Sequence, residues 1–304
     1  MSDMAPLKAK VSLLERAAEV YDFAEHARAR GASVAPQPVA QPVAQPLPIA
    51  PVAKAAPRRG VAAIDRALLA ERGLLVPGAA IDALTEEFRL VKRQLLTTAR
   101  TVRRSDADLS RTILVCSAQP NDGKTFCAVN LAISLAAERD VEVLLIDADF
   151  AQPDVLARLG LPDGPGLLDA LADPKVDVER CVVRTDIPQL SLLPCGTKSN
   201  ADTELVASAR TGELIAQLLA ADPTRLLIFD SPPVLAASPA SVLANYAGQV
   251  MLVVRADCTG ESDLREAVAL LDGCEHVQLV LNAVAFAPGG RRFGTYYTQE
   301  EDAT

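Results

Sequence analysis

The stretch "CSAQPNDGKTF" at residues 116–126 decides the fold class of this chain. It closes with Gly123, Lys124 and Thr125, the last three positions of the phosphate-binding pattern G-x-x-x-x-G-K-[ST]. An apolar run at residues 112–116 leads into it, and a helical pattern begins at Lys124. Strand, loop and helix in this order form a phosphate loop, because the loop N–H groups and the helix N-terminus attract anions. The stretch therefore predicts a nucleotide site.

The loop departs from that pattern at its first position, where Ala118 stands in place of glycine. The extra methyl group limits positive φ but removes no N–H donor, so the loop can still bind phosphate if Ala118 has ordinary φ. Lys124 would reach the terminal phosphates and Thr125 would bind Mg²⁺. On this stretch alone, a Gly-Lys-Thr sequence that follows a strand by chance remains an alternative interpretation. The candidate nucleotide-binding residues of the loop are Ala118, Gln119, Pro120, Asn121, Asp122, Gly123, Lys124, Thr125 and Phe126.

Apolar runs alternate with helical patterns through the rest of the chain. The predicted strands are "TILVCS", "EVLLIDAD", "RLLIFD", "VMLVV" and "VQLVLN", and the predicted helices between them cover residues 124–139, 203–220, 238–246 and 260–272. Nearly continuous apolar strands of this kind are buried on both faces, with helices as crossovers. The chain therefore predicts an α/β fold with a doubly wound, mostly parallel sheet, whose ligands bind at the carboxyl ends of the strands.

Three carboxylates follow two of these strands at the edge where the loop lies. Asp147 and Asp149 end "VLLIDAD", and Asp230 ends the strand of "LLIFDSPP". One such residue is explained by a turn or a helix cap, but three beside a phosphate loop match Mg²⁺-assisted phosphoryl transfer. We therefore take Lys124, Asp147, Asp149 and Asp230 as candidate catalytic residues, with Thr125, Asp147 and Asp230 as candidate metal ligands.

Composition excludes several other classes of function. The chain has 304 residues and a net charge of -9, which disfavours nucleic acid and anionic membrane as direct partners. Six cysteines without a C-x-x-C pair, and two histidines, disfavour a zinc site and a Ser-His-Asp mechanism. No apolar run approaches the roughly 18 residues of a membrane span. We expect a cytoplasmic protein that reaches a membrane only through a partner.

The segments on either side of the predicted sheet have other compositions. Residues 1–30 predict an amphipathic helix, and residues 31–60 form a proline- and alanine-rich linker that could also be read by a proline-binding domain. Residues 61–105 predict helix, with an apolar stripe at Leu84, Phe88, Val91 and Leu95. We assign residues 61–288 to a P-loop domain and residues 289–304 to a flexible tail.

The loop at 117–125, the D-x-D strand at 144–149 and the D-x-P-P strand at 226–233 together resemble the bacterial tyrosine kinases of exopolysaccharide export. These belong to the MinD/ParA-like P-loop ATPases, and the exosortase-associated type is the most similar. The stretches "LTEEFRLVKRQLL", "IPQLSLLPCG" and "LVLNAV" extend the resemblance over residues 61–298. It implies a SIMIBI-like NTPase fold, ATP and Mg²⁺ as cofactors, and tyrosine autophosphorylation in trans.

The resemblance also implies roles for single residues. Asp147 would orient or deprotonate the acceptor hydroxyl, Asp149 and Asp230 would support the metal, and Asn282 would lie near the adenine. A helix carrying Glu86, Arg89 and Lys92 would contact the next subunit of a homo-oligomeric ring, and Tyr296 and Tyr297 would be the phosphate acceptors. The implied partner is a membrane polysaccharide co-polymerase that acts as adaptor and holds the kinase at the inner membrane.

Some positions depart from the family pattern. Asn121 replaces a glycine, Ala151 replaces the arginine of D-x-D-x-R, Lys92 replaces an arginine, and the tail has few tyrosines. A weakly active or inactive nucleotide-binding scaffold is therefore an alternative to the kinase. A MinD/ParA-type positioning ATPase is a third interpretation, but such proteins carry a lysine where this chain has Gln119.

Overall fold

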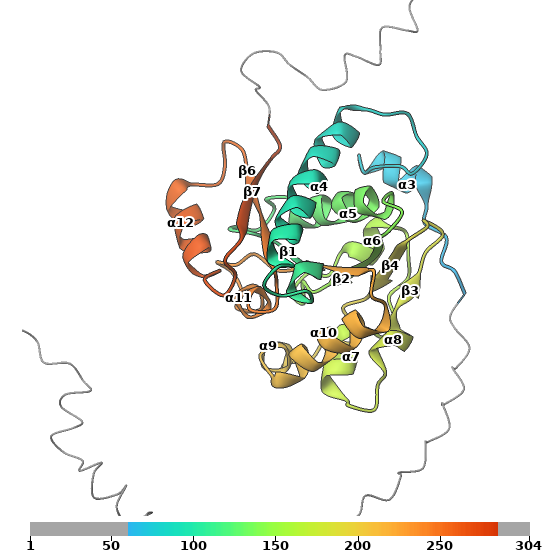
Figure 1. Ribbon diagram of the computed structural model, residues 1–304, viewed down its shortest axis with the longest axis vertical. Coiled ribbons are helices and arrows are strands. Elements are labelled where there is room, and N and C mark those ends of the chain that lie inside the picture. Colours follow the sequence, from blue (N-terminus) through green and yellow to red (C-terminus); the bar gives the residue numbers. More distant parts are fainter. Residues whose placement is uncertain (1–59, 285–304) are drawn as a thin grey trace, which may run out of the picture. The chain divides into compact units, whose positions relative to one another are not determined.

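The computed structural model describes residues 60–284, which contain a seven-stranded sheet and its covering helices (Figure 1). The expected helix at residues 1–30, nearly all of the linker and the tail at residues 289–304 lie outside the described residues. The strands are β1 (Thr112–Ser117), β2 (Glu142–Asp147), β3 (Val183–Arg184), β4 (Leu190–Leu193), β5 (Arg225–Asp230), β6 (Gln249–Arg255) and β7 (Val277–Asn282). The helices are α3 (Arg66–Glu71), α4 (Ala83–Val102), the 3₁₀ turn η1 (Leu109–Arg111), α5 (Lys124–Ala136), α6 (Val155–Arg158), α7 (Leu167–Ala172), α8 (Val178–Cys181), α9 (Asp202–Val206), α10 (Ala209–Ala221), α11 (Pro239–Ala244) and α12 (Glu261–Ala269).

The sheet has the order β3-β4-β2-β5-β1-β6-β7. All neighbouring strands are parallel except β3 and β4, which are antiparallel. The chain starts the sheet at β1 near its middle and winds outward in both directions, so β1 and β5 meet at the centre. This is the doubly wound, mostly parallel sheet that the sequence predicted.

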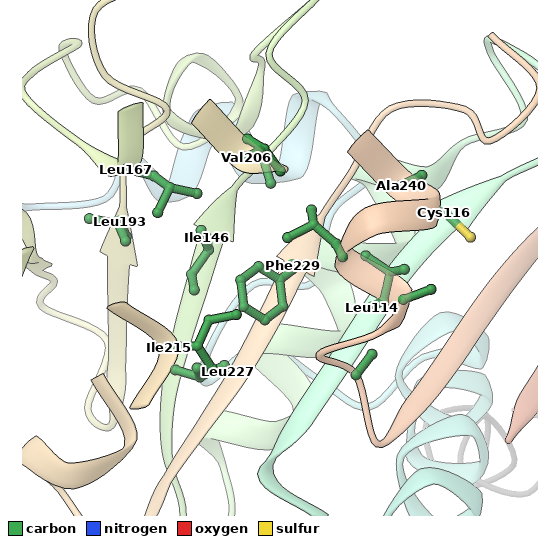
Figure 2. Close-up of a cluster of buried hydrophobic side chains, with 14 of the residues drawn as sticks. Leu114, Cys116, Ile146, Leu167, Leu193, Val206, Ile215, Leu227, Phe229 and Ala240 are labelled. Carbon is green, nitrogen blue, oxygen red and sulfur yellow. The ribbon is translucent and has the colours of Figure 1, made fainter. Parts of the chain in front are cut away.

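Each central strand sends alternate side chains into two separate cores. Leu114 and Cys116 of β1 join a cluster with α7, α8, α10 and α11, part of which Figure 2 shows around Phe229. Ile113 and Val115 point to the other face, where α3, α4, α5 and α6 pack. Burial of both faces explains why these strands are continuous apolar runs without a polar alternation.

The helical prediction for residues 61–105 is wrong at residues 61–65, which precede α3, and at residues 72–82, where a loop separates α3 from α4. Gly73 and Gly78 adopt positive φ values of 64° and 82°, which break the helix. The loop is held in place from within, because Leu74 and Leu75 are buried and the Leu75 N–H donates to Asn130 Oδ1 at 2.7 Å. The predicted apolar stripe of α4 is confirmed: Phe88 and Leu95 are buried, and Leu84 and Val91 pack against the same cluster.

Other boundaries also differ from the sequence prediction. The predicted helix at residues 203–220 is two helices, α9 and α10, separated where Ser208 is extended at ψ 158°. Strands β3 and β4 and the short helices α6, α7 and α8 were not predicted at all. Their lengths of two to six residues are too short for a hydrophobic period to develop. Among the helices between residues 60 and 284, none is long and apolar enough to cross a membrane.

Replacing Leu95 by alanine should destabilise the fold strongly. Leu95 is 1% exposed at the contact of α4 with the sheet, so its removal leaves a cavity that costs about 2–5 kcal/mol of unfolding free energy. Leu90 lies on the same helix but is 46% exposed, so Leu90→Ala is the matched control and should change stability by less than about 0.5 kcal/mol. Urea denaturation measures both, and equal losses would contradict the packing described for α4.

Candidate functional site

The loop at residues 118–123 has the backbone that the sequence required of it. Among the described non-glycine residues with positive φ, Asn121 has a φ of 66°, whereas Ala118 is not one of them. Asparagine tolerates this left-handed conformation, so the missing glycines at both positions leave the loop unstrained at Ala118 and acceptable at Asn121. The carbonyl of Ala118 accepts from the Leu235 N–H at 3.3 Å, which ties the start of the loop to the segment after β5.

Gly123 is required at the end of the loop for two reasons. Its φ of 97° is left-handed, and a Cβ atom there would overlap the side-chain amide of Asn282. That amide donates to the Asp122 carbonyl at 2.9 Å. Asn282, which the resemblance placed near the adenine, therefore also holds the loop from the end of β7.

Residues from the end of β6 to the first turn of α12 fix the loop, and the sequence analysis missed them. The buried carboxylate of Asp122 accepts from the Gln119 N–H at 3.1 Å and from the Thr259 hydroxyl at 3.2 Å. Gln119 donates its side-chain amide to Asp263 at 3.2 Å, and Arg255 donates to the Asn121 carbonyl at 3.2 Å. The pattern of the loop itself carries no signal for Arg255, Thr259 or Asp263, because they follow it by more than 130 residues.

The three predicted carboxylates meet at the ends of β2 and β5. Asp147 and Asp230 are register partners on these neighbouring parallel strands, and both are fully buried. Asp147 Oδ2 accepts from the Val155 N–H at 3.0 Å, and Asp149 Oδ2 forms an ion pair with Lys124 Nζ at 2.8 Å. Asp147 Oδ1 and both oxygens of Asp230 have no hydrogen-bond partner among the described residues. Buried acceptor atoms normally have a partner, so these three oxygens beside the loop are candidate ligands for a cation.

Burial raises the pKa of two of these carboxyl groups. The pKa of Asp230 rises from 3.8 to about 8, first because of burial and then because of the negative charge of Asp147. The pKa of Asp147 rises to about 7, mainly through burial, while the N–H of Val155 opposes the rise. Shifts of this size in a cluster of acids are typical of functional sites.

The residues present fit a Mg²⁺ ion. Mg²⁺ takes oxygen ligands, keeps several waters and binds through one or two carboxylates together with substrate phosphates. The unpartnered oxygens of Asp147 and Asp230, next to the buried Thr125, are such a donor set. Within residues 60–284 no three His, Cys, Asp or Glu side chains are arranged to hold a metal by themselves.

A cavity of about 460 Å³ opens over this edge of the sheet. Its walls combine the loop, the start of α5, the segment leading into α6 and the turn after β5. The lining residues are Pro120, Asn121, Gly123, Lys124, Thr125, Phe126, Asp149, Ala151, Gln152, Pro153, Asp154, Arg158, Pro232, Pro233, Ala236 and Ala237. Asp147 and Asp230 are not part of the lining and are buried.

A second cavity of about 330 Å³ lies between α4 and β7. Its walls are mainly apolar and include Leu90, Leu279 and Leu281, while Asn282 and Phe126 stand where it borders the loop. Strand β7 is one edge of the sheet, and Leu279 and Leu281 are exposed on it.

The expected ring-contact residues lie on α4. Glu86 and Arg89 form an ion pair with each other, one turn apart on a half-exposed face. Lys92 is buried instead, where it donates to the Ser134 carbonyl at 2.9 Å and pairs with Glu138 at 2.7 Å. In the described structure Lys92 thus anchors α4 to its own subunit. The predicted acceptors Tyr296 and Tyr297 lie outside the described residues.

The chain is similar in sequence to one described domain family and to several bacterial tyrosine-protein kinases. Residues 110–278 match the model of the AAA domain family. The tyrosine-protein kinase YwqD of Bacillus subtilis is 31% identical over 196 residues, which cover 64% of this chain and 81% of that protein. The tyrosine-protein kinase wzc of Salmonella typhimurium is 30% identical over 190 residues, 62% of this chain. The match spans 26% of the length of that second relative.

Solved structures agree with these relatives. The kinase domain of VpsO is 28% identical, with a TM-score of 0.53 over 64% of this chain and 97% of that structure. The kinase domain of the Escherichia coli tyrosine kinase ETK is 26% identical, with a TM-score of 0.54 over 60% of this chain and 72% of that structure. The doubly wound P-loop fold predicted from the sequence is therefore confirmed.

Asp230→Asn should change how stability depends on pH in metal-free protein. The native state keeps the Asp230 proton up to a pKa of about 8, whereas the unfolded state loses it near 3.8. Since the native state binds more protons in this range, wild-type stability falls as the pH rises from about 4 to 8. The melting temperature of the variant minus that of the wild type should therefore increase with pH, measured by calorimetry in EDTA.

The control for this experiment is Asp222→Asn. Asp222 has a pKa below its ordinary value, chiefly through a hydrogen bond from Thr224, so it is ionised in both states above pH 5. Its substitution should shift the melting temperature by the same amount at every pH from 5 to 8. A flat difference for Asp230→Asn as well would contradict a buried, proton-retaining Asp230.

Gly123→Ala should disrupt the loop, because the new Cβ atom overlaps the Asn282 amide at a backbone angle that alanine avoids. Adding Asn282→Ala removes the overlap but not the strain of positive φ. We expect the double variant to recover part of the stability that Gly123→Ala loses, measured by urea denaturation. Equal stability of Gly123→Ala and the wild type would be inconsistent with the described loop.

Proposed function

The chain belongs to the AAA domain family and to the bacterial tyrosine kinases, and from this premise we propose that it transfers the γ-phosphoryl group of ATP to tyrosine. The observation that carries the proposal is the set of three unpartnered, buried carboxylate oxygens beside Lys124 and Thr125. Groups buried without partners are costly, so they are retained where a ligand completes them. Mg²⁺ and the phosphates of ATP are ligands of matching chemistry.

The residues of this chain divide the work as follows. The N–H groups of the loop and the N-terminus of α5 would bind the phosphates, and the Thr125 hydroxyl with Asp147 and Asp230 would hold Mg²⁺. The bound metal supplies positive charge that stabilises the transferring phosphoryl group. Lys124 exchanges its ion pair with Asp149, at 2.8 Å in the described structure, for the terminal phosphates. Asn282 lies beside the loop and would border the base of the nucleotide.

Phosphoryl transfer needs an acceptor for one proton. The bond from the tyrosine oxygen to the γ-phosphorus forms while the bond from the γ-phosphorus to the bridging oxygen of ADP breaks. Asp147 takes the hydroxyl proton, or orients the hydroxyl for attack. Its Oδ1 oxygen has no hydrogen-bond partner among the described residues, so it is available to receive or orient this hydroxyl.

The acceptors that we propose are Tyr296 and Tyr297 of a neighbouring copy of the chain. Contact between copies would use the face of α4 that carries Glu86 and Arg89, which is half exposed. We further propose that the protein works at the cytoplasmic side of the inner membrane, held there by a polysaccharide co-polymerase. The putative tyrosine-protein kinase CapB of Staphylococcus aureus, at 25% identity, supports the kinase activity, and the role in polysaccharide export is the one that the family resemblance implies.

Phosphopeptide mass spectrometry tests the activity and its acceptor. Wild-type protein with ATP and Mg²⁺, co-expressed with the candidate adaptor, should carry phosphate on Tyr296 or Tyr297. Lys124→Met should reduce that phosphorylation at least about a hundredfold. It removes the positive charge that stabilises the transferring phosphoryl group, and such an interaction lowers the barrier by several kcal/mol. Phosphate that persists in Lys124→Met would point to a contaminating kinase.

The control variant is Lys198→Met, which removes an exposed lysine that does not line the main cavity. It should keep the wild-type level of phosphate. Absence of phosphate from the wild type, with ATP still bound, would favour the scaffold interpretation over the kinase.

A further inference from the structure

We propose that Arg158 binds the phosphate end of the nucleotide and supplies the positive charge that Ala151 lacks. This inference rests on the proposed function, since it assigns a further residue to the same nucleotide site. Ala151 stands where the D-x-D-x-R pattern has arginine, and both Ala151 and Arg158 line the cavity over Lys124. Arg158 follows the position of the missing arginine by seven residues, and it lines the same cavity.

The fold holds Arg158 firmly at the cavity wall. Arg158 is the last residue of α6, whose first N–H, that of Val155, donates to Asp147 Oδ2 at 3.0 Å. The other end of α6 is fixed from α3, because Arg72 donates to the Ala157 carbonyl at 2.8 Å. The position of Arg158 is therefore tied to the carboxylate that we propose to act on the tyrosine hydroxyl.

The charged groups of the cavity lining form two ion pairs. Lys124 pairs with Asp149, and Arg158 Nε pairs with Asp154 at 2.6 Å. Arg158 Nε is buried and makes no hydrogen bond within residues 60–284, so its contact with Asp154 is an ion pair without a well-aligned hydrogen bond. A guanidinium has the planar geometry that binds phosphate through two hydrogen bonds. The Arg158 pair is also partly exposed, so it is weak and easily rearranged.

Lys198 is the competing source of positive charge near Ala151. Its ammonium donates to the Ala151 carbonyl at 2.9 Å. It is exposed, however, and does not line the cavity, whereas Arg158 does. Arg255 is engaged with the Asn121 carbonyl at the outer side of the loop. Among the lysine and arginine residues that the structure describes, Arg158 and Lys124 are the two that line this cavity.

Equilibrium binding tests the inference on the full chain with Mg²⁺. ATP and ADP affinities are measured by calorimetry for the wild type, Arg158→Ala and Lys198→Ala. We expect Arg158→Ala to weaken ATP binding about tenfold, as for loss of one charged hydrogen bond, and ADP binding less. Lys198→Ala should stay within about twofold of the wild type, because a solvated surface lysine contributes little. Thermal unfolding checks that each variant is folded, and Arg158→Lys replaces Arg158→Ala if it is not.

Rescue by a second substitution makes the test specific to the charge. Ala151→Arg, added to Arg158→Ala, should restore most of the lost ATP affinity, because it returns a guanidinium to the same cavity. Wild-type ATP affinity in Arg158→Ala, with binding lost in Lys124→Met, would overturn the role of Arg158 and leave the proposed function intact. A loss in Lys198→Ala equal to that in Arg158→Ala, or no rescue, would also overturn it. If the wild type bound no ATP, both proposals would fail together.

Discussion

The pairing of β2 with β5 imposes the constraint on which the rest of the structure depends. Two parallel strands in register bring Asp147 and Asp230 side by side at the carboxyl ends of the strands, and helices cover both faces of the sheet. Neither carboxylate can turn to water, and three of their oxygens have no partner in the described residues. Burial raises the pKa of both carboxyl groups, and the negative charge of Asp147 raises that of Asp230 further, so the metal-free site holds protons to a higher pH than an exposed carboxyl group. A bound cation would stabilise the ionised carboxylates, so cation binding and stability both depend on this one arrangement.

Much of this arrangement could be predicted from the sequence because it is encoded locally. Strands buried on both faces are continuous apolar runs, and a carboxylate directly after such a run must lie at the ligand-binding edge. The strand β4 escaped prediction because "LSLL" is short and interrupted by a serine. The break at residues 72–82 was missed because the apolar residues Leu74 and Leu75 continue the pattern, although their backbone leaves the helix.

Features that depend on contacts between distant segments could not be predicted from a single sequence. Thr259 donates a hydrogen bond to the phosphate loop, and Asp263 accepts one from it. Both bonds join segments that only the folded sheet brings together. Lys92 shows the same limit, since the resemblance implied that it contacts a neighbouring subunit. Its long side chain reaches Ser134 and Glu138 of the neighbouring helix region instead. Helical periodicity predicts the direction of the Cα–Cβ bond. The charged end of a long lysine or arginine side chain can still reach polar partners on another side of the helix.

The ion pair between Lys124 and Asp149 has a consequence for the kinetics of nucleotide exchange. An internal carboxylate competes with the incoming phosphate for the same ammonium group, so only the fraction of molecules with a released lysine is ready to bind. The apparent affinity is lowered by that fraction. The same carboxylate is at hand when the nucleotide departs, so the lysine always has a partner and dissociation never strands a bare buried charge. The ion pair would thus lower the affinity for nucleotide while keeping Lys124 paired in the nucleotide-free site.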